Sequence, residues 1–252
     1  MILDIALIIF LFMTVVFILA LIKKDNSIVD IFWGIGFIII MIYSLIQSGE
    51  VDLRKMIVSL LVFLWGLRLS YHIMMRNTGR GEDFRYKNWR NTWKFFIIRS
   101  FFQIFMLQGL VMLIVSTPIW YINMNSTGLP GIWDMIGLFI FGTGFMTEMI
   151  ADHQLALFKK NPANSGKIMT TGLWSISRHP NYFGEALVWW GISFYALGLH
   201  NGWYVLISPV VITLLLRFVS GVPMIEKKYE GRADWEAYKS ETPAFVPYIK
   251  GL

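Results

Sequence analysis

The sequence lacks cysteine altogether and has little histidine or charge. With no cysteine among 252 residues, disulfide bonds, thiolate catalysis and cysteine-ligated metals are excluded. Four histidines occur, at positions 72, 153, 179 and 200, without an HExxH pattern, so we expect no metal site. Charged residues make up 15% of the chain, against about 25% in a typical soluble domain. Most classes of soluble protein are therefore excluded.

Apolar residues fill the place of what is missing. They make up 56% of the sequence, and the mean hydropathy is +0.58, which is typical of a membrane protein. A helix needs about 20 mainly apolar residues to cross the hydrocarbon core of a bilayer. Seven segments meet this requirement, at residues 2–22, 28–48, 56–75, 99–121, 133–155, 182–200 and 203–222.

These segments predict an all-α integral membrane protein with seven transmembrane helices in a single domain over residues 1–252. No internal repeat, low-complexity tract or Gly/Ser linker divides the chain. The first segment, MILDIALIIF, lacks the positively charged start and the small-residue cleavage site of a signal peptide, so we expect it to be a retained span.

The distribution of basic residues predicts the orientation of the helices. If the loops after the first, third and fifth spans and the C-terminal tail face the cytosol, those regions hold 19 of the 22 Lys and Arg residues. Cytosolic loops of membrane proteins carry such an excess. We therefore expect the N-terminus outside and the C-terminus in the cytosol. The net charge of +6 then points to a nucleotide cofactor or anionic lipid headgroups, and not to nucleic acid.

Polar side chains inside the spans are the first candidates for function, because they are costly at membrane depth unless they meet a partner, a cavity or a ligand. They are Asp30, Arg68, His72, Arg76, Glu148, Asp152, His153, Gln154, Asn181, Glu185 and Arg217. Two interpretations remain open for each residue. One is structural pairing between helices, such as Asp30 with Arg68, and the other is a functional site. Several of them lie toward the predicted cytosolic ends, where one aqueous pocket open to the cytosol could hold them all.

The stretch SRHPNYFGE places polar residues at the start of an apolar segment. Pro180 suits the first helical position, where its missing N–H does no harm. The free amides and positive end of such a helix favour an anion. Arg178 and His179 are then expected to donate to a phosphate, while Asn181 and Glu185 point into the helix bundle.

Two tempting patterns are discounted. The GIG at 34–36 and the GTG at 142–144 lie inside apolar segments without a βαβ context, so they are not dinucleotide fingerprints. Seven spans also occur in retinal proteins, but the seventh segment contains no lysine for a Schiff base.

Several motifs together resemble one superfamily of membrane enzymes. They are VDIFWG at 29–34, WGLRLSYHI at 65–73, GRGEDFRY at 79–86, E-x-x-x-D-x-Q at 148–154, TGLWSISRHPNYFGE at 171–185, SGVPMIEKKY at 220–229 and YKSETPAFVP at 238–247. With these motifs the chain resembles the steroid 5-alpha-reductase superfamily, and specifically its bacterial branch related to the 3-oxo-5-alpha-steroid 4-dehydrogenase C-terminal domain. The resemblance covers most of the chain.

The resemblance implies a seven-helix fold that binds NADPH in a pocket open to the cytosol and reduces a carbon–carbon double bond in a lipophilic enone. Glu148 and Asp152 match the family's Asn and Asp that hold the cofactor, although Glu148 replaces an amide with a carboxylate. Asn181 and Lys159 match a family asparagine and arginine. The residues predicted to bind NADPH are Arg68, Arg76, Arg80, Glu148, Asp152, Lys159, Arg178, His179, Asn181, Tyr182, Glu185 and Arg217.

The same resemblance places Asp30 where the steroid enzymes carry a glutamate that binds the substrate ketone. Trp65 stands at the family position of the tyrosine that works with it, so the enone need not be a steroid. Hydride addition leaves negative charge on the carbonyl oxygen, which requires a hydrogen-bond donor there. A carboxyl group at membrane depth can stay protonated. We therefore predict Asp30 as this donor and Tyr86 as its catalytic partner, with Tyr71 as another candidate.

The expected partners are NADPH, a lipophilic small molecule from the bilayer and membrane lipids, and no obligate protein partner is indicated. The loops at about 77–98 and 157–180 are long and contain tryptophan, so we expect them to be ordered and docked on the membrane face. A bacterial inner membrane is the expected location.

Two other classes of function remain open. RHPxYxG followed by a glutamate-containing helix also resembles isoprenylcysteine and phospholipid methyltransferases, which use S-adenosylmethionine. Against this alternative, Glu226 is followed by Lys227 where those enzymes usually show a pair of glutamates. The third class is a lipid-binding or assembly protein without enzymatic activity, which would bind neither cofactor.

Overall fold

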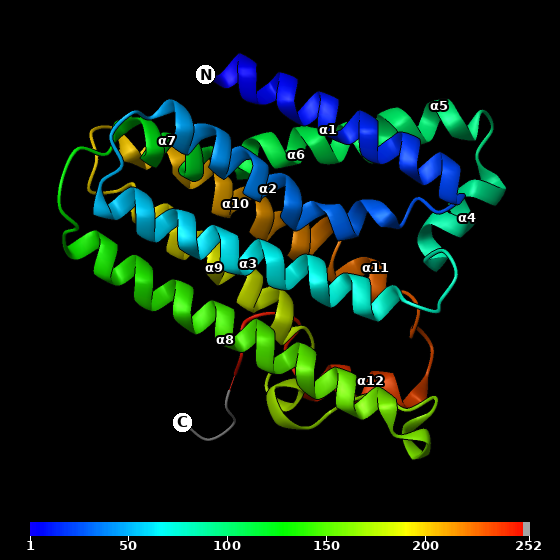
Figure 1. Cartoon of the computed structure of the whole chain (residues 1–252). Helices are drawn as coiled ribbons and strands as arrows, with labels where there is room; N and C mark the ends of the chain where they lie inside the picture. The colour runs from blue at the N-terminus through cyan, green and yellow to red at the C-terminus, as the bar shows by residue number, and fades with distance from the viewer. Residues whose placement is uncertain (249–252) are drawn as a thin grey trace. The chain divides into compact units, whose positions relative to one another are not determined.

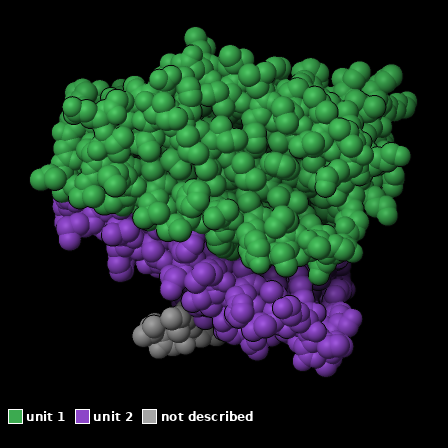
Figure 2. Space-filling model, viewed as in Figure 1, with its two compact units in different colours: residues 1–130, 199–205 green, residues 131–198, 206–252 purple. Residues whose placement is uncertain are grey.

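The computed structural model describes residues 1–248 and is all-α, with no strand in that range. The chain divides into two compact units, coloured separately in Figure 2. Unit 1 comprises residues 1–130 and 199–205, and unit 2 comprises the described residues of 131–198 and 206–252. Lys250, which we counted among the basic residues of the C-terminal tail, lies outside the described residues. The all-α prediction is confirmed.

Unit 1 contains three long helices followed by a series of short ones (Figure 1). They are α1 (Ile2–Lys23), α2 (Ile28–Gln47), α3 (Leu53–Asn77), α4 (Phe84–Thr92), α5 (Phe96–Ser100), η1 (Phe101–Met106), α6 (Leu107–Val115), α7 (Thr117–Asn125) and η4 (Gly202–Leu206), whose last residue belongs to unit 2. Helices α2 and α3 make the most extensive contact in this unit.

Unit 2 is built on the close pairing of α8 and α9, which lie side by side in Figure 1. Its helices are α8 (Ile132–Lys160), η2 (Pro162–Asn164), η3 (Gly172–Ser175), α9 (Pro180–Phe194), α10 (Ile207–Leu214), η5 (Leu215–Val219), α11 (Val222–Glu226) and α12 (Ala233–Glu241). Pro180 is the first residue of α9, as the sequence predicted.

Six helical stretches within residues 1–248 are long and apolar enough to cross a membrane. They are Ile2–Lys23, Ile28–Gln47, Leu53–Asn77, Phe96–Asn125, Ile132–Lys160 and Gly202–Glu226. They coincide with six of the seven predicted spans, so the chain is a multi-pass membrane protein. The remaining predicted span, 182–200, corresponds to α9, which has 15 residues, and its crossing of the membrane stays a prediction.

Glycine brings the main helix pairs of both units into backbone contact. In unit 1, a Cβ atom added to Gly34 would lie 2.2 Å from the carbonyl oxygen of Gly66 on α3. In unit 2, a Cβ atom on Gly184 would lie 2.6 Å from the backbone nitrogen of Glu148 and 2.7 Å from the carbonyl oxygen of Gly144. Small residues permit such approach between membrane helices. The glycine of GIG at position 34 therefore serves helix packing.

Two of the basic residues outside the predicted cytosolic regions are buried in unit 1. Arg54 and Lys55 are 6% and 4% exposed. Arg54 donates from Nη1 to Ser126 Oγ at 3.3 Å, and Lys55 donates from Nζ to the carbonyl oxygen of Glu50 at 2.6 Å. Because both cations are used inside the unit, they do not weaken the charge pattern on which the predicted orientation rests.

Two π-helical segments interrupt predicted spans. In unit 1, η1 joins α5 to α6, and its Phe101 and Phe105 rings meet Phe17 of α1 edge-on at 5.1 and 5.2 Å. In unit 2, η5 follows α10 and contains Arg217. Such segments are frequent at functional sites, and no pattern in the apolar runs predicts them.

Candidate active site

Asp30 lies in the first turn of α2, at its third residue. The predicted span 28–48 likewise puts Asp30 at its third residue. A carboxylate in the first turn of a helix is stabilised by the partial positive charge of the helix N-terminus. The side chain of Asp30 is 19% exposed. Asp30 is therefore placed at the end of its span, where polar partners from the following loops can reach it.

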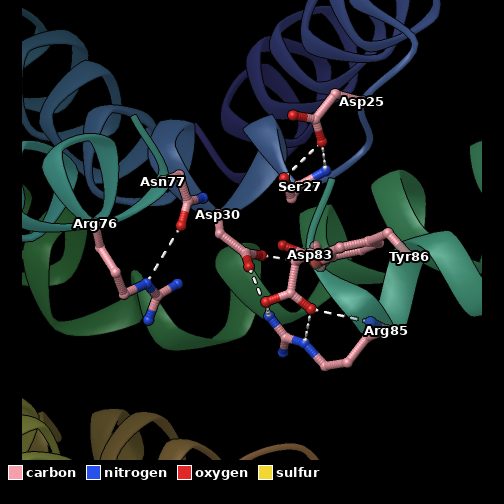
Figure 3. Close-up of polar contacts among 9 residues, drawn as sticks. Asp25, Ser27, Asp30, Arg76, Asn77, Asp83, Arg85 and Tyr86 are labelled. Carbon is pink, nitrogen blue, oxygen red and sulfur yellow. Dashed lines mark hydrogen bonds and ion pairs between the residues drawn. The ribbon is translucent and has the colours of Figure 1, made fainter. Parts of the chain in front are cut away.

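Helix α4 supplies these partners (Figure 3). Tyr86 donates its hydroxyl proton to Oδ1 of Asp30 at 2.6 Å, and Arg85 donates from Nη2 to Oδ2 at 2.9 Å. The two residues that the sequence analysis named as catalytic thus lie in direct hydrogen-bond contact. In this hydrogen bond Tyr86 is the donor and Asp30 the acceptor.

Asp83 fixes the start of α4 and the position of Arg85. Its Oδ1 accepts a hydrogen bond from the backbone nitrogen of Arg85 at 3.0 Å, which caps the helix, and another from Arg85 Nε at 2.9 Å. Burial alone would raise the pKa of Asp83, but its hydrogen bonds with Arg85 hold it below the usual value. Burial likewise opposes the charge on Arg85, but Asp30 and Asp83 raise its pKa above the usual value. Arg85 is thus held between two carboxylates.

A second ion pair anchors α4 to the loop before α2. Arg90 donates from Nε to Oε2 of Glu82 at 2.8 Å and from Nη2 to Oε1 at 2.8 Å. The same Oε1 accepts the backbone N–H of Asn26 at 2.8 Å. A bidentate guanidinium–carboxylate pair fixes orientation as well as distance. The loop carrying Asp25 to Ser27, drawn in Figure 3, is thereby joined to α4.

Tyr86 is the buried member of the site, at 3% exposure. Burial and the neighbouring Asp30 raise the pKa of its phenol well above the ordinary value. Its oxygen lies 3.4 Å from Nε2 of Gln108 on α6, a further hydrogen bond. The phenol is therefore neutral at physiological pH and keeps a proton available for donation.

The other predicted residues of unit 1 lie on and after α3. Arg76 in its last turn is exposed and donates from Nε to Asn77 Oδ1 at 3.3 Å. Arg80 is exposed in the loop that follows, and Arg68 is half-buried in α3. Tyr71, the other candidate tyrosine, is 59% exposed. The structure thus joins Tyr86 to Asp30, and it gives Tyr71 no comparable place.

In unit 2 a polar group lies on the facing sides of α8 and α9. Asn181 donates from Nδ2 to Asp152 Oδ1 at 3.1 Å. Glu148 and Glu185 are 2% and 9% exposed. The contact of Gly144 and Gly184 brings these turns of the two helices together. Asn181 and Glu185 are directed into the helix pair, as the sequence predicted for that stretch.

Arg178 and His179 lie just before α9, and both contact Glu226 at the end of α11. Arg178 donates from Nε to Glu226 Oε1 at 2.9 Å, and His179 Nε2 lies 3.1 Å from the same oxygen. The Arg178 guanidinium also donates to the carbonyl oxygens of Lys239 and Thr242. To bind a cofactor phosphate, Arg178 and His179 would first have to leave Glu226.

The remaining predicted residues of unit 2 lie around this group. The Tyr182 ring stacks on the His179 ring with centroids 5.5 Å apart. Lys159 is exposed in the last turn of α8. Arg217 is half-buried, with its guanidinium 4.9 Å from the ring centre of Phe218.

Unit 1 also holds an apolar cavity of about 180 Å³ between α1 and the η1–α6 stretch. It is lined by Ala6, Ile9, Phe10, Met13, Met106, Gly109, Leu110 and Leu113. None of these lining side chains is charged, so the cavity offers an apolar surface.

Sequence reasoning missed Arg85, Asp83 and Glu226 as members of these polar groups. Arg85 and Asp83 lie inside the GEDFRY motif, and their signal was the two adjacent acids followed closely by an arginine there. Glu226 was considered only because Lys227, and not a second glutamate, follows it. Its partner Arg178 is 48 residues away, and no local pattern predicts that contact.

The fold and these two polar groups define a multi-pass helical membrane protein with ionisable residues gathered near helix ends. The chain belongs to the family described as "Protein of unknown function (DUF1295)", whose family model matches residues 16–242. No solved structure matches the chain.

Three curated relatives are similar to parts of the chain. An uncharacterized protein of Schizosaccharomyces pombe is 31% identical over 202 residues, covering 69% of this chain and 58% of the relative. A probable O-methyltransferase, ustE, of Ustilaginoidea virens is 50% identical over 46 residues, 18% of this chain and 16% of the relative. A Delta(14)-sterol reductase of Arabidopsis thaliana is 29% identical over 79 residues, 27% and 21% of the two chains. The chain thus spans less than two thirds of each relative.

Proposed function

We propose that the protein is an NADPH-dependent reductase of a carbon–carbon double bond in a lipophilic enone, of the steroid 5-alpha-reductase type. The observation that carries this proposal is the hydrogen bond of 2.6 Å between Tyr86 and Asp30, because it joins a proton donor to the carboxylate that the family resemblance assigns to substrate binding. The similarity to a plant sterol reductase supports it.

In the proposed reaction, NADPH, when bound, would supply the hydride for the β-carbon of the enone, and water would supply the proton that the α-carbon takes up. The Tyr86 hydroxyl has one proton, which it donates to Asp30 before the substrate binds and would then turn to the carbonyl oxygen, where negative charge develops. Asp30 accepts from the phenol and orients it, and Arg85 holds Asp30 in place. The raised pKa of Tyr86 keeps its proton on the oxygen until the carbonyl gains charge. The enone enters from the bilayer, and a 3-oxo-delta-4 steroid is one candidate.

The α8–α9 polar group fits the amide end of the cofactor. Oδ1 of Asn181 is buried and accepts no hydrogen bond within residues 1–248, so it can accept an N–H from the nicotinamide amide. Asp152 and Glu148 can accept from ribose hydroxyls or the same amide. The basic residues predicted to bind the phosphates are Arg68, Arg76, Arg80, Lys159, Arg178 and Arg217, of which Arg178 would first have to leave Glu226.

A methyltransferase that uses S-adenosylmethionine is the second candidate. The 46-residue match to a probable O-methyltransferase favours it. So does the charge of the α8–α9 group, because Glu148, Asp152 and Glu185 suit the positive sulfonium and amino groups of S-adenosylmethionine better than a phosphate.

We further propose seven spans, with the N-terminus outside, the C-terminus in the cytosol, and α9 crossing as the sixth. The positive charge of the predicted cytosolic loops supports this orientation, in a bacterial inner membrane. Reporter fusions after residues 90 and 165 should report cytosol, and those near 126 and 201 the opposite side. A cytosolic signal at 126 would overturn this orientation.

Binding measurements separate the candidate functions. Purified protein is first examined by absorbance and fluorescence for co-purified nucleotide, then titrated with NADPH, NADH and S-adenosylmethionine. We expect NADPH to bind most tightly, and Asn181→Ala to weaken it by about tenfold, since a buried acceptor to a ligand N–H contributes roughly 1.5 kcal/mol. Asn88→Ala, an exposed position on α4, is the matched control. Tighter binding of S-adenosylmethionine would favour the methyltransferase, and binding of neither would favour a lipid-binding or assembly protein.

A further inference from the structure

The segment from Phe84 to Arg99 has five basic residues and no carboxylate. Two of them, Arg85 and Arg90, are bound to carboxylates of unit 1. The other three are Lys87, Lys94 and Arg99. All three are exposed, and none forms an ion pair within the described residues 1–248. The segment therefore presents three positive charges outside the ion pairs of unit 1, although Glu82 attracts Lys87 at longer range.

These three cations lie beside exposed apolar side chains at the start of a predicted span. Phe95 is 80% exposed, and Ile97 and Ile98 are 58% and 62% exposed. The apolar stretch that follows begins at Phe96. A mixture of tryptophan, basic and apolar side chains is typical of the membrane–water interface. Each basic residue near an anionic membrane surface is attracted by the headgroup charge.

A continuous series of ring contacts connects this surface to the candidate active site. The guanidinium of Arg99 lies 4.6 Å from the ring centre of Trp93. Trp93 stacks on Trp89 with centroids 5.2 Å apart and planes 15° apart. Trp89 in turn meets the Tyr86 ring edge-on at 5.4 Å. The exposed end and the buried end of α4 are thus parts of one packed column.

We propose that Lys87, Lys94 and Arg99 form a binding surface for the headgroups of anionic phospholipids, and that lipid bound there orders α4 and so holds Tyr86 against Asp30. The three cations attract the phosphodiester of an anionic headgroup, which carries one negative charge. The rings that pack against Arg99 give the bound state a direct connection to the catalytic tyrosine. The lipid-binding half stands without the proposed reductase activity, and only the consequence for turnover rests on it.

The binding half is tested with the full chain in nanodiscs of phosphatidylcholine containing increasing phosphatidylglycerol. Lipid retained after detergent extraction is measured by mass spectrometry. We expect the wild type to retain phosphatidylglycerol in preference to phosphatidylcholine. The triple variant Lys87→Gln, Lys94→Gln, Arg99→Gln should lose that preference by at least about tenfold, because each basic residue near the surface contributes about 1 kcal/mol.

A matched control changes three exposed basic residues of unit 2, Lys160→Gln, Lys167→Gln and Lys239→Gln. This variant has the same net charge as the triple variant of α4 and should retain phosphatidylglycerol like the wild type. If the α4 variant retains phosphatidylglycerol as well as the wild type does, these three cations do not bind it and the proposal is overturned. An equal loss in both variants would show that overall charge accounts for the binding and would also overturn the proposal.

The coupling half is tested by hydrogen exchange of the α4 amides, which needs no substrate. Phosphatidylglycerol should slow exchange in the wild type and leave the triple variant unchanged. Trp93→Ala removes the middle of the column, so it should still retain phosphatidylglycerol but lose the slowing at residues 84–92. If Trp93→Ala shows the same slowing as the wild type, the column does not connect the two ends. Because this measurement does not use turnover, its result is separate from the outcome for the reductase proposal.

Discussion

Two motifs, GEDFRY in unit 1 and RHPNY in unit 2, use their arginines in different ways. Arg85 of the first binds Asp30 at a partly exposed position next to a buried tyrosine. Arg178 of the second is 8% exposed and binds Glu226 and two backbone carbonyls near the C-terminus. The first arginine supports a group that can act on a ligand, whereas the second holds the protein's own chain together. A motif that identifies a family therefore need not be the part that performs the chemistry.

The largest effect is expected at Tyr86, where a substitution tests whether the group around Arg85 takes part in catalysis. Tyr86→Phe removes the proposed proton donor, so kcat for reduction of a 3-oxo-delta-4 probe steroid should fall by about 10²–10⁴-fold. The loss in stability should be no more than about 1 to 1.5 kcal/mol, the usual contribution of one hydrogen bond. NADPH oxidation and thermal melts measure the two quantities. Tyr71→Phe, at an exposed tyrosine, is the control, and an equal loss in both variants would reject the assignment.

Substitutions of Asp30 test whether the group of Asp30, Arg85 and Tyr86 is only structural. Asp30→Leu should abolish turnover and leave NADPH affinity nearly unchanged, while Asp30→Asn retains partial activity with a larger effect on kcat than on KM. The alternative is a structural ion pair between Asp30 and Arg85. If Asp30→Leu and Arg85→Leu each melt early and the double variant of both recovers stability and activity, the pair is structural and Asp30 has no catalytic role.

Arg178 should show the opposite behaviour, a loss of stability. Arg178→Ala leaves the Glu226 carboxylate without its guanidinium, so we expect a loss of roughly 3–5 kcal/mol in the free energy of unfolding. Arg178→Lys keeps the charge but loses the fork of donors. Its free energy of unfolding should fall between those of the wild type and Arg178→Ala. Arg232→Ala, at an exposed pair with Asp234, should change the melting temperature little. A stable Arg178→Ala protein with weakened NADPH binding would instead restore the role expected from the sequence.

A smaller effect is expected where α8 and α9 touch. Gly184→Ala places a methyl group 2.6 Å from the backbone of Glu148, so the helices must separate, at a cost of about 1–3 kcal/mol. Gly142→Ala on α8 is the matched control, because a Cβ atom there meets nothing within 4 Å, and alanine favours a helix by up to about 1 kcal/mol. Thermal melts of the two variants should therefore shift in opposite directions, and a shared direction would contradict the close contact.

The smallest effect concerns pH. Burial lowers the pKa of His179, although its hydrogen bond to Glu226 acts in the opposite direction, and the positive charges of Arg178 and Arg217 lower it further. The unfolded chain therefore binds the proton more readily than the folded chain. This contribution to stability is present above the pKa of an unfolded histidine, about 6.5, and is lost as the pH falls toward the folded value. Melts of His179→Gln should depend less on pH in this range than those of the wild type, whereas His153→Gln, at an exposed position, should not differ.

The spans could be predicted because each is a long apolar run, and the start of α9 because proline favours the first position of a helix. Asp30 and Tyr86 could each be chosen by chemistry, but their contact could not, since 56 residues separate them. The predicted span 28–48 begins at the first residue of α2, so the position of Asp30 near that end could be predicted, but its pairing with Arg85 could not. Composition and local pattern thus predicted the helices and the candidate residues, whereas the contacts between distant residues came only from the structure.

The length of α9 has a consequence for the bilayer itself. Its 15 residues make a helix about 22 Å long at about 1.5 Å per residue, shorter than the roughly 30 Å of hydrocarbon that a span has to match. If α9 crosses as proposed, the difference is met by a locally thinner membrane or by polar chain drawn below the headgroups. Either response admits water to the first turn of α9. A nucleotide from the aqueous phase and a substrate dissolved in lipid could then meet without either one leaving its own solvent completely.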